Sequence, residues 1–152
     1  MKEISKYWMS ILIFLFVFIF DGKLWAQQVN PQQQAIAQKA AETIVNALGT
    51  QKYSLLWSQY TSQWFKSKVD ENVFLANLSM GRAQFGQIQK ISLVSFEHAT
   101  SDPVNAFQGD IYAFTFRDKY PIGEFYERIV VIKDTDGQFR MSGLFGSAVP
   151  TQ

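Results

Sequence analysis

The sequence predicts an α+β domain whose helices come first and whose strands form an antiparallel sheet. Apolar residues recur at helical spacing in the first half of the chain, from Ile36 to Phe85. From Gln89 to Phe145 they alternate with polar residues instead, which is the period of a β-strand. Short turn-like links separate the alternating segments, so consecutive strands are expected to pair as hairpins.

The first 26 residues have the layout of a secretory signal peptide. Lys2 and Lys6 precede an apolar run over residues 8–20, and a short segment ending in Ala26 follows. The run is shorter than the roughly 20 residues of a membrane-spanning helix, which favours cleavage after Ala26 over an uncleaved anchor. The mature protein is therefore expected in the periplasm or outside the cell, contacting the membrane only through its transient signal peptide. Because the chain has no cysteine, a lipoprotein is not expected.

Three helices are expected before the first strand. Asn30 as N-cap and Pro31 as first helical residue predict a helix that Gly49 ends. Apolar stripes predict two further helices, over residues 52–60 and, after the cap Asp70, over residues 70–85. The residues between them, 61–68, are expected to be helical or irregular.

Four strands are expected after the helices, over residues 89–97, 107–117, 123–133 and 138–145. The residues Asp134 to Gly137 are a strong hairpin signal, which explains both aspartates of this segment without a bound cation. The whole is expected to be a single domain over residues 31–148, preceded by a short leader at 27–30.

The pattern of residues resembles an exported bacterial family known as domain of unknown function 4019. The resemblance rests on Trp57, Arg82, Phe85, Gly86, Gly109, Tyr112, Phe114, Phe116, Glu127, Ile129, Val131, the segment 136–140 and Gly143. Phe139 and Leu144 depart from the family pattern, where Trp and Tyr are expected. The order of elements is also similar to the nuclear-transport-factor-two-like, or cystatin-like, superfamily. That resemblance implies a cone-like fold, with three helices in the concavity of a curved sheet.

Composition excludes several function classes. Removing residues 1–26 leaves equal numbers of basic and acidic residues, so no basic excess points to nucleic acid. His98 is the only histidine, which argues against a two-histidine metal site, and no cofactor motif is present. We expect His98 to be an exposed loop residue.

Strand alternation supplies the main candidate site. It puts Glu127 on the same face as Phe125, Ile129 and Val131, and it puts Phe139, Met141, Gly143 and Phe145 together on one face of the last strand. If this wall faces the helices, Glu127 is a carboxylate among aromatic residues and either forms a structural ion pair with Arg82 or acts as a general acid or base with Tyr112. The candidate pocket residues are Trp57, Phe85, Tyr112, Phe114, Glu127, Phe139 and Met141.

The opposite face of the sheet is expected to mix charged and apolar residues. Its candidates for a partner contact are Arg117, Tyr126, Arg128 and Arg140, with Ser142 and Leu144 on the same face.

Three functions remain open. The leading one is a non-catalytic envelope domain that binds a small apolar ligand or a protein partner. The alternatives are an isomerase- or dehydratase-like enzyme using Glu127 and Tyr112, which the superfamily resemblance allows, and a structural homodimer formed through the outer sheet face.

Overall fold

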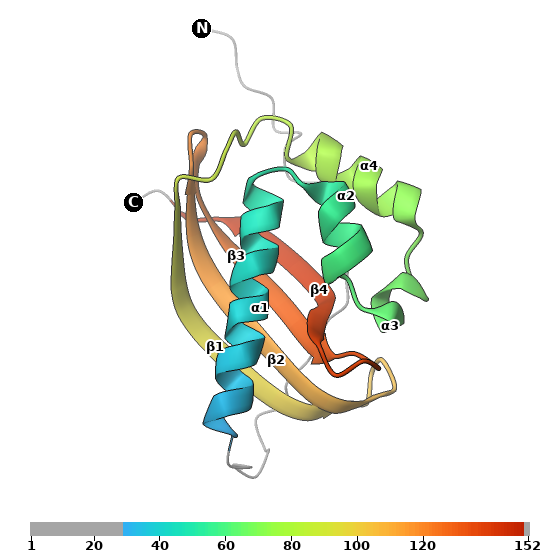
Figure 1. Ribbon diagram of the computed structural model, residues 1–152. Helices are drawn as coiled ribbons and strands as arrows, with labels where there is room; N and C mark the ends of the chain where they lie inside the picture. Colours follow the sequence, from blue (N-terminus) through green and yellow to red (C-terminus); the bar gives the residue numbers. More distant parts are fainter. Residues whose placement is uncertain (1–28, 151–152) are drawn as a thin grey trace, which may run out of the picture.

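A computed structural model describes residues 29–150 as an α+β domain in which helices lie along one side of a curved sheet (Figure 1). The helices are α1 (Pro31–Gly49), α2 (Tyr53–Leu55), the π-helix η1 (Leu56–Tyr60), α3 (Gln63–Lys66) and α4 (Glu71–Gly81). The strands are β1 (Lys90–Asp102), β2 (Phe107–Tyr120), β3 (Gly123–Lys133) and β4 (Phe139–Ala148). They form one antiparallel sheet in the order β1-β2-β3-β4, as the hairpin-like links predict. The predicted signal peptide lies outside the described residues.

The long helix α1 begins as the sequence predicts but ends for a different reason. The Asn30 side chain accepts hydrogen bonds from the backbone N–H groups of Gln32 and Gln33. Gly49 does not act as a left-handed stop, because it is the last helical residue. A Cβ at this position would lie 2.6 Å from the Cβ of Ile88, so the glycine lets the segment that enters β1 pack against the end of α1.

The expectation of three helices is wrong in its count. The predicted helix at residues 52–60 is present as α2 followed by η1, and a separate short helix, α3, follows it. Ser62 caps α3, because its hydroxyl accepts from the backbone N–H of Phe65. The last helix, α4, ends at Gly81 rather than Phe85, and a turn with a positive φ at Gly86 leads on to β1. No helix among residues 29–150 is long and apolar enough to cross a membrane.

The strands β1 and β2 are longer than predicted. β1 continues past Glu97 to Asp102, so His98 lies in a strand and not in an exposed loop. β2 continues past Arg117 to Tyr120, although three of its last four residues are charged. As a result, Asp118 and Tyr120 follow Phe116 on the face that packs against the helices.

A shift of register between β3 and β4 overturns part of the predicted alternation. Val130 pairs with Gly143 but Val131 pairs with Met141, so Ser142 is an extra residue in β4. Phe139 and Met141 lie in the main core, as expected. Gly143 pairs with Val130, and Phe145 packs against the buried residues of the convex face. Leu144, which was expected on the outer face, packs against the main core instead.

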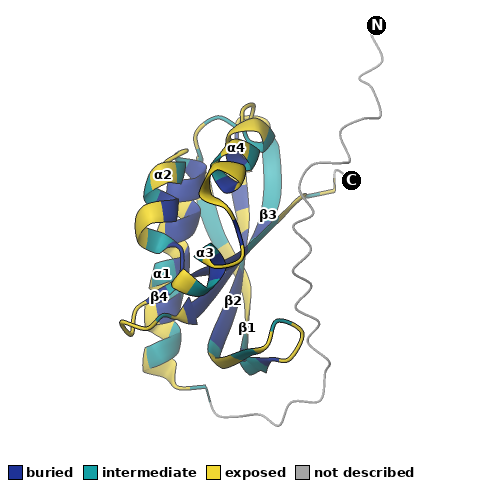
Figure 2. Cartoon of the chain, turned by 90° about the vertical axis from the view of Figure 1, so that its right-hand side faces the viewer, coloured by how far each residue is buried: buried dark blue, intermediate teal, exposed yellow. Residues whose placement is uncertain are grey.

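The main core fills the space between the helices and the concave face of the sheet (Figure 2). α1 packs against β2, β3 and β4 and contributes Ala37, Ala41, Ile44, Val45 and Leu48 to this core. Contacts between aromatic side chains hold η1, α3 and α4 together. The ring centroid of Trp57 lies 5.2 Å from that of Phe74 and 6.4 Å from that of Phe65. A second, smaller group of buried residues lies on the convex face and comprises Ala99, Ile111, Ala113, Val130 and Ile132.

Candidate functional site

A hydrogen-bonded cluster of charged and phenolic side chains lies between the end of α4 and the β2–β3 hairpin. Arg82, just after α4, forms an ion pair with Glu127 of β3, the contact that their apolar stripes suggested. Arg82 also donates to the Tyr120 hydroxyl at 2.6 Å, and that hydroxyl donates to the other carboxylate oxygen of Glu127 at 2.7 Å. The three groups close a ring in which each carboxylate oxygen has a donor.

Asp118 completes this cluster, and its carboxyl group is fully buried. As a carboxylate, it would have no hydrogen-bond partner for either oxygen among the described residues. Burial, together with the hydrogen bond and the charge of the neighbouring Glu127, raises the pKa of Asp118 to about 8, although Arg82 and a backbone hydrogen bond from Ser92 act in the opposite direction. Because this pKa lies above neutral, the carboxyl group of Asp118 carries its proton at pH 7, and a hydrogen bond with Glu127 favours that form. We call Arg82, Asp118, Tyr120 and Glu127 the acid cluster.

The acid cluster is nearly closed to solvent. Only 1% of the Glu127 side chain and 11% of the Arg82 side chain are exposed. The rings of Phe85 and Tyr120 lie 4.7 and 5.2 Å from the Arg82 guanidinium, and Phe85 stacks on Phe125. Burial also raises the pKa of Tyr120 above its ordinary value, as does the charge of Glu127. The cluster can store and share a proton, but its carboxylates are screened from a substrate.

The structure does not bring Tyr112 and Glu127 together. Tyr112 pairs with Val131, whereas Glu127 pairs with Phe116, so three residue pairs lie between their positions along the strands. Tyr112 instead meets His98, whose Nε2 lies 3.1 Å from Oδ1 of Asp110 and whose ring centroid lies 4.5 Å from that of Tyr112. Within residues 29–150, no group of three or more histidine or acidic residues could hold a metal ion.

Most of the predicted pocket residues belong to the core. Trp57, Tyr112, Phe114, Phe139 and Met141 are at most 7% exposed. Tyr112 packs edge-on against Phe139, with 5.5 Å between centroids. Phe85 is half-buried beside the acid cluster. Of the predicted set, Phe139 alone lines the open pocket described next.

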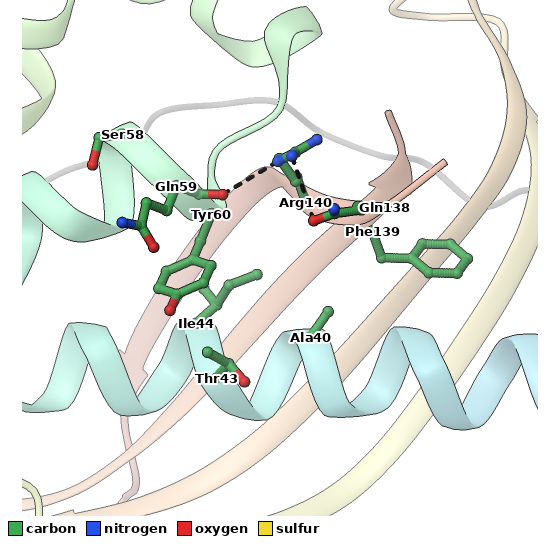
Figure 3. Close-up of a pocket in the computed structure, with 9 residues that line it drawn as sticks. All are labelled: Ala40, Thr43, Ile44, Ser58, Gln59, Tyr60, Gln138, Phe139 and Arg140. Atoms are coloured by element: carbon green, nitrogen blue, oxygen red, sulfur yellow. Dashed lines mark hydrogen bonds between the residues drawn. The ribbon is translucent and has the colours of Figure 1, made fainter. Parts of the chain in front are cut away.

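An open pocket of about 500 Å³ lies between α1, η1 and the start of β4, and we call it the cleft (Figure 3). Nine residues line it: Ala40, Thr43 and Ile44 from α1, Ser58, Gln59 and Tyr60 from η1, and Gln138, Phe139 and Arg140 around the start of β4. The Tyr60 ring reaches toward α1 from the opposite wall (Figure 3). The cleft therefore combines aliphatic and aromatic walls with hydroxyl and amide groups.

Arg140 supplies the charge in this lining, and acidic neighbours already neutralise it. Its guanidinium contacts Asp136 at 2.6 and 2.7 Å and Asp134 at 3.1 Å. The hydrogen bond from Arg140 lowers the pKa of Asp136 to about 2. Arg140 also donates to the backbone oxygen of Gln59 at 3.2 Å and so joins η1 to the β3–β4 hairpin (Figure 3). Its role in the cleft is to hold two walls together.

The other arginines predicted as partner contacts also have acidic partners within the chain. Arg128 makes two hydrogen bonds to Glu97, at 2.6 and 3.0 Å. Arg117 binds Glu124, with 2.9 Å from its Nε to Oε2. Tyr126 pairs with Arg117 across β2 and β3 and is half-buried. The charges of the outer face are thus balanced by neighbours on the same sheet or, for Arg140, by the β3–β4 turn.

Sequence reasoning missed Asp118 and Tyr120 of the acid cluster. Their signal was available, because the alternation Phe114, Phe116, Asp118, Tyr120 keeps a period of two to the end of β2. The sequence Lys119-Tyr120-Pro121 instead suggested a turn, so the strand was expected to end at Arg117. The cleft had no such signal, because its walls come from segments that are distant in the chain.

The family described as protein of unknown function (DUF4019) matches residues 40–144. This range includes all of the acid cluster and all nine residues of the cleft. No curated protein and no solved structure matches the chain.

Proposed function

We propose that this protein, which belongs to the DUF4019 family, is a non-catalytic, exported binding domain. Its ligand is a small, uncharged, largely apolar molecule or the apolar side chains of a protein partner, and it occupies the cleft. The observation that carries the proposal is the open pocket of about 500 Å³ between α1, η1 and β4.

The size and lining of the cleft favour binding. Ligand pockets commonly have volumes of about 300 to 1,000 Å³, with apolar walls and a few polar groups that orient the ligand. The half-buried Ala40 and Tyr60 offer apolar contact area, above a floor formed by the buried Ile44 and Phe139. Ser58 and Gln138 offer neutral hydrogen-bonding groups. The π-helical winding of η1 also supports a site here, because such windings are frequent at functional sites.

The charge of the cleft favours an uncharged ligand. Arg140 has its guanidinium bound by Asp134, Asp136 and the Gln59 carbonyl, so an anion would have to compete with carboxylates that already hold it. A cation would be repelled by Arg140, and none of the nine lining residues is an acid that could offset this repulsion. A neutral molecule avoids both costs.

Export is part of the proposal and rests on the sequence of residues 1–26. If the signal peptide is cleaved after Ala26, mass spectrometry of the envelope fraction will find a chain that begins at Gln27. A chain intact from Met1 in the inner membrane contradicts this part of the proposal. The placement within the nuclear-transport-factor-two-like superfamily is likewise proposed, on the order of helices and strands.

The binding proposal can be tested by filling the cleft. Thr43 is exposed on α1 at the edge of the pocket, so Thr43→Trp puts an indole there without opening the core. Nile red, a neutral apolar dye, serves as the probe, and its fluorescence on titration measures affinity. We expect the substitution to weaken dye binding by about tenfold or more, since a filled pocket forfeits apolar contact area worth roughly 1.4 kcal/mol or more.

Glu42→Trp is the matched control, because Glu42 is exposed on the same helix and does not line the cleft. It should leave dye binding unchanged. Equal affinities for the parent and Thr43→Trp, or a parent that does not bind the dye, would count against the cleft as the binding site.

A second candidate function is acid–base catalysis at the acid cluster, and the proton held by Asp118 favours it. Buried carboxylates with displaced pKa values are frequent in active sites. Two observations weigh against it: Glu127 is bound by both Arg82 and Tyr120, and almost none of its side chain is exposed. We therefore rank it below binding.

A further inference from the structure

We propose that β1 is an interface for a second copy of this chain, with two β1 strands pairing antiparallel at the edge of the sheet. β1 is an edge strand of the four-stranded sheet. The residues 93–97 form a continuous exposed run within it, in which Leu93 is 40%, Val94 55% and Phe96 41% exposed. Exposed apolar edge strands are sites where another strand adds.

The helices leave this edge accessible. α1 packs against β2, β3 and β4, and β1 lies at the rim of the sheet beyond it (Figure 1). Phe96 is only partly covered, although its ring stacks on Phe114 of the neighbouring strand. A second sheet edge can therefore approach β1 without displacing a helix.

An irregularity in β1 determines which register fits. Leu93 pairs with Phe116 and Ser95 pairs with Thr115, so Val94 is an extra residue in the strand. Before it, the odd-numbered Ile91 lies on the concave face. After it, the even-numbered Phe96 lies on that face, opposite Phe114.

A two-fold axis between Leu93 and Val94 makes the strand complementary to itself. It sets Lys90 opposite Glu97 of the second copy and Ile91 opposite Phe96 of the second copy. Both members of each pair lie on the same face of the sheet, a match that the extra residue makes possible. Because the contact is isologous, each pair occurs twice.

The charges favour a second copy over an unrelated strand. Within its own chain, Lys90 lies across from Lys119, which is a pair of like charges. In the dimer it gains Glu97, an exposed carboxylate held on its own sheet by Arg128. The interface thus joins two opposite-charge pairs around an apolar centre.

The test uses protein expressed from the full chain and purified in the form the cell makes, studied by sedimentation velocity over a wide range of concentrations. The parent should form a dimer. Lys90→Glu and Glu97→Lys each place like charges opposite one another twice, so each alone should raise the dimer dissociation constant by about tenfold or more. Mixing the two variants restores both opposite-charge pairs, and a one-to-one dimer should return.

Lys68→Glu is the control, since Lys68 is exposed near α3 and far along the chain from β1. It should dimerise like the parent, and circular dichroism should show that all variants are folded. A parent that is monomeric at every concentration, single variants that associate as the parent does, or a mixture that stays monomeric each overturns the proposal.

Discussion

The acid cluster and the cleft both lie on the helix side of the sheet, but they use their polar groups in opposite ways. In the acid cluster, Arg82 and Tyr120 each donate to one carboxylate oxygen of Glu127, and only 1% of the Glu127 side chain is exposed. In the cleft, the polar side chains of Ser58 and Gln59 are exposed around an open volume of about 500 Å³. The residues with the most distinctive chemistry are thus the least accessible.

A carboxyl group with a perturbed pKa therefore need not mark the place where a ligand binds. The acid cluster joins the end of α4 to β2 and β3, which is a structural task. The cleft has no group with unusual reactivity and is suited to contact rather than to chemistry. Substitutions in each region can show whether the two regions have these separate roles.

The largest expected effect comes from breaking the ion pair of the acid cluster. Arg82→Leu leaves Glu127 buried without its cation, which should lower the free energy of unfolding by about 3 to 5 kcal/mol. The double variant with Glu127→Leu should recover part of this loss. Urea unfolding measures both. Arg117→Leu is the control and should have a small effect, because its pair with Glu124 is exposed. Additive losses in the double variant would show that the pair is not coupled.

A smaller effect is expected from the proton on Asp118. Between the pKa of an unfolded aspartate, near 3.9, and its folded pKa of about 8, the folded state keeps a proton that the unfolded state has released. Stability should therefore fall as pH rises through this window and level off above it.

Asp118→Asn isolates this contribution, because the amide imitates the protonated acid and still donates to Glu127. The variant should match the parent near pH 4 and exceed it in stability above pH 8. Unfolding curves taken across this range measure the difference. Parallel stability profiles for the two proteins would show that Asp118 is ionised in the folded state at neutral pH.

The sequence predicts the order of helices and strands better than the alignment of the strands. Periodicity and the Asn30 cap locate α1 and all four strands, because these signals are local. The extra residues Val94 and Ser142 depend on how two strands align, so alternation alone could not find them, and Leu144 was assigned to the wrong face.

Of the two candidate sites, the acid cluster could be predicted from local patterns and the cleft could not. The meeting of Arg82 with Glu127 follows from two apolar stripes that face each other, and extending the period of β2 by three residues would have added Asp118 and Tyr120. The cleft depends on how α1, η1 and the β3–β4 hairpin pack, which is a property of the tertiary structure. No local pattern in the chain carries that information.

The most direct test compares Glu127→Gln with Thr43→Trp in the same Nile red titration and the same unfolding experiment. Glu127→Gln keeps the shape of the acid cluster but removes the negative charge that pairs with Arg82. It should lower stability by about 1 to 3 kcal/mol while leaving dye affinity unchanged. Thr43→Trp should do the reverse, weakening dye binding with little loss of stability. If Glu127→Gln abolishes dye binding and Thr43→Trp does not, the ligand site lies at the acid cluster and the account is wrong.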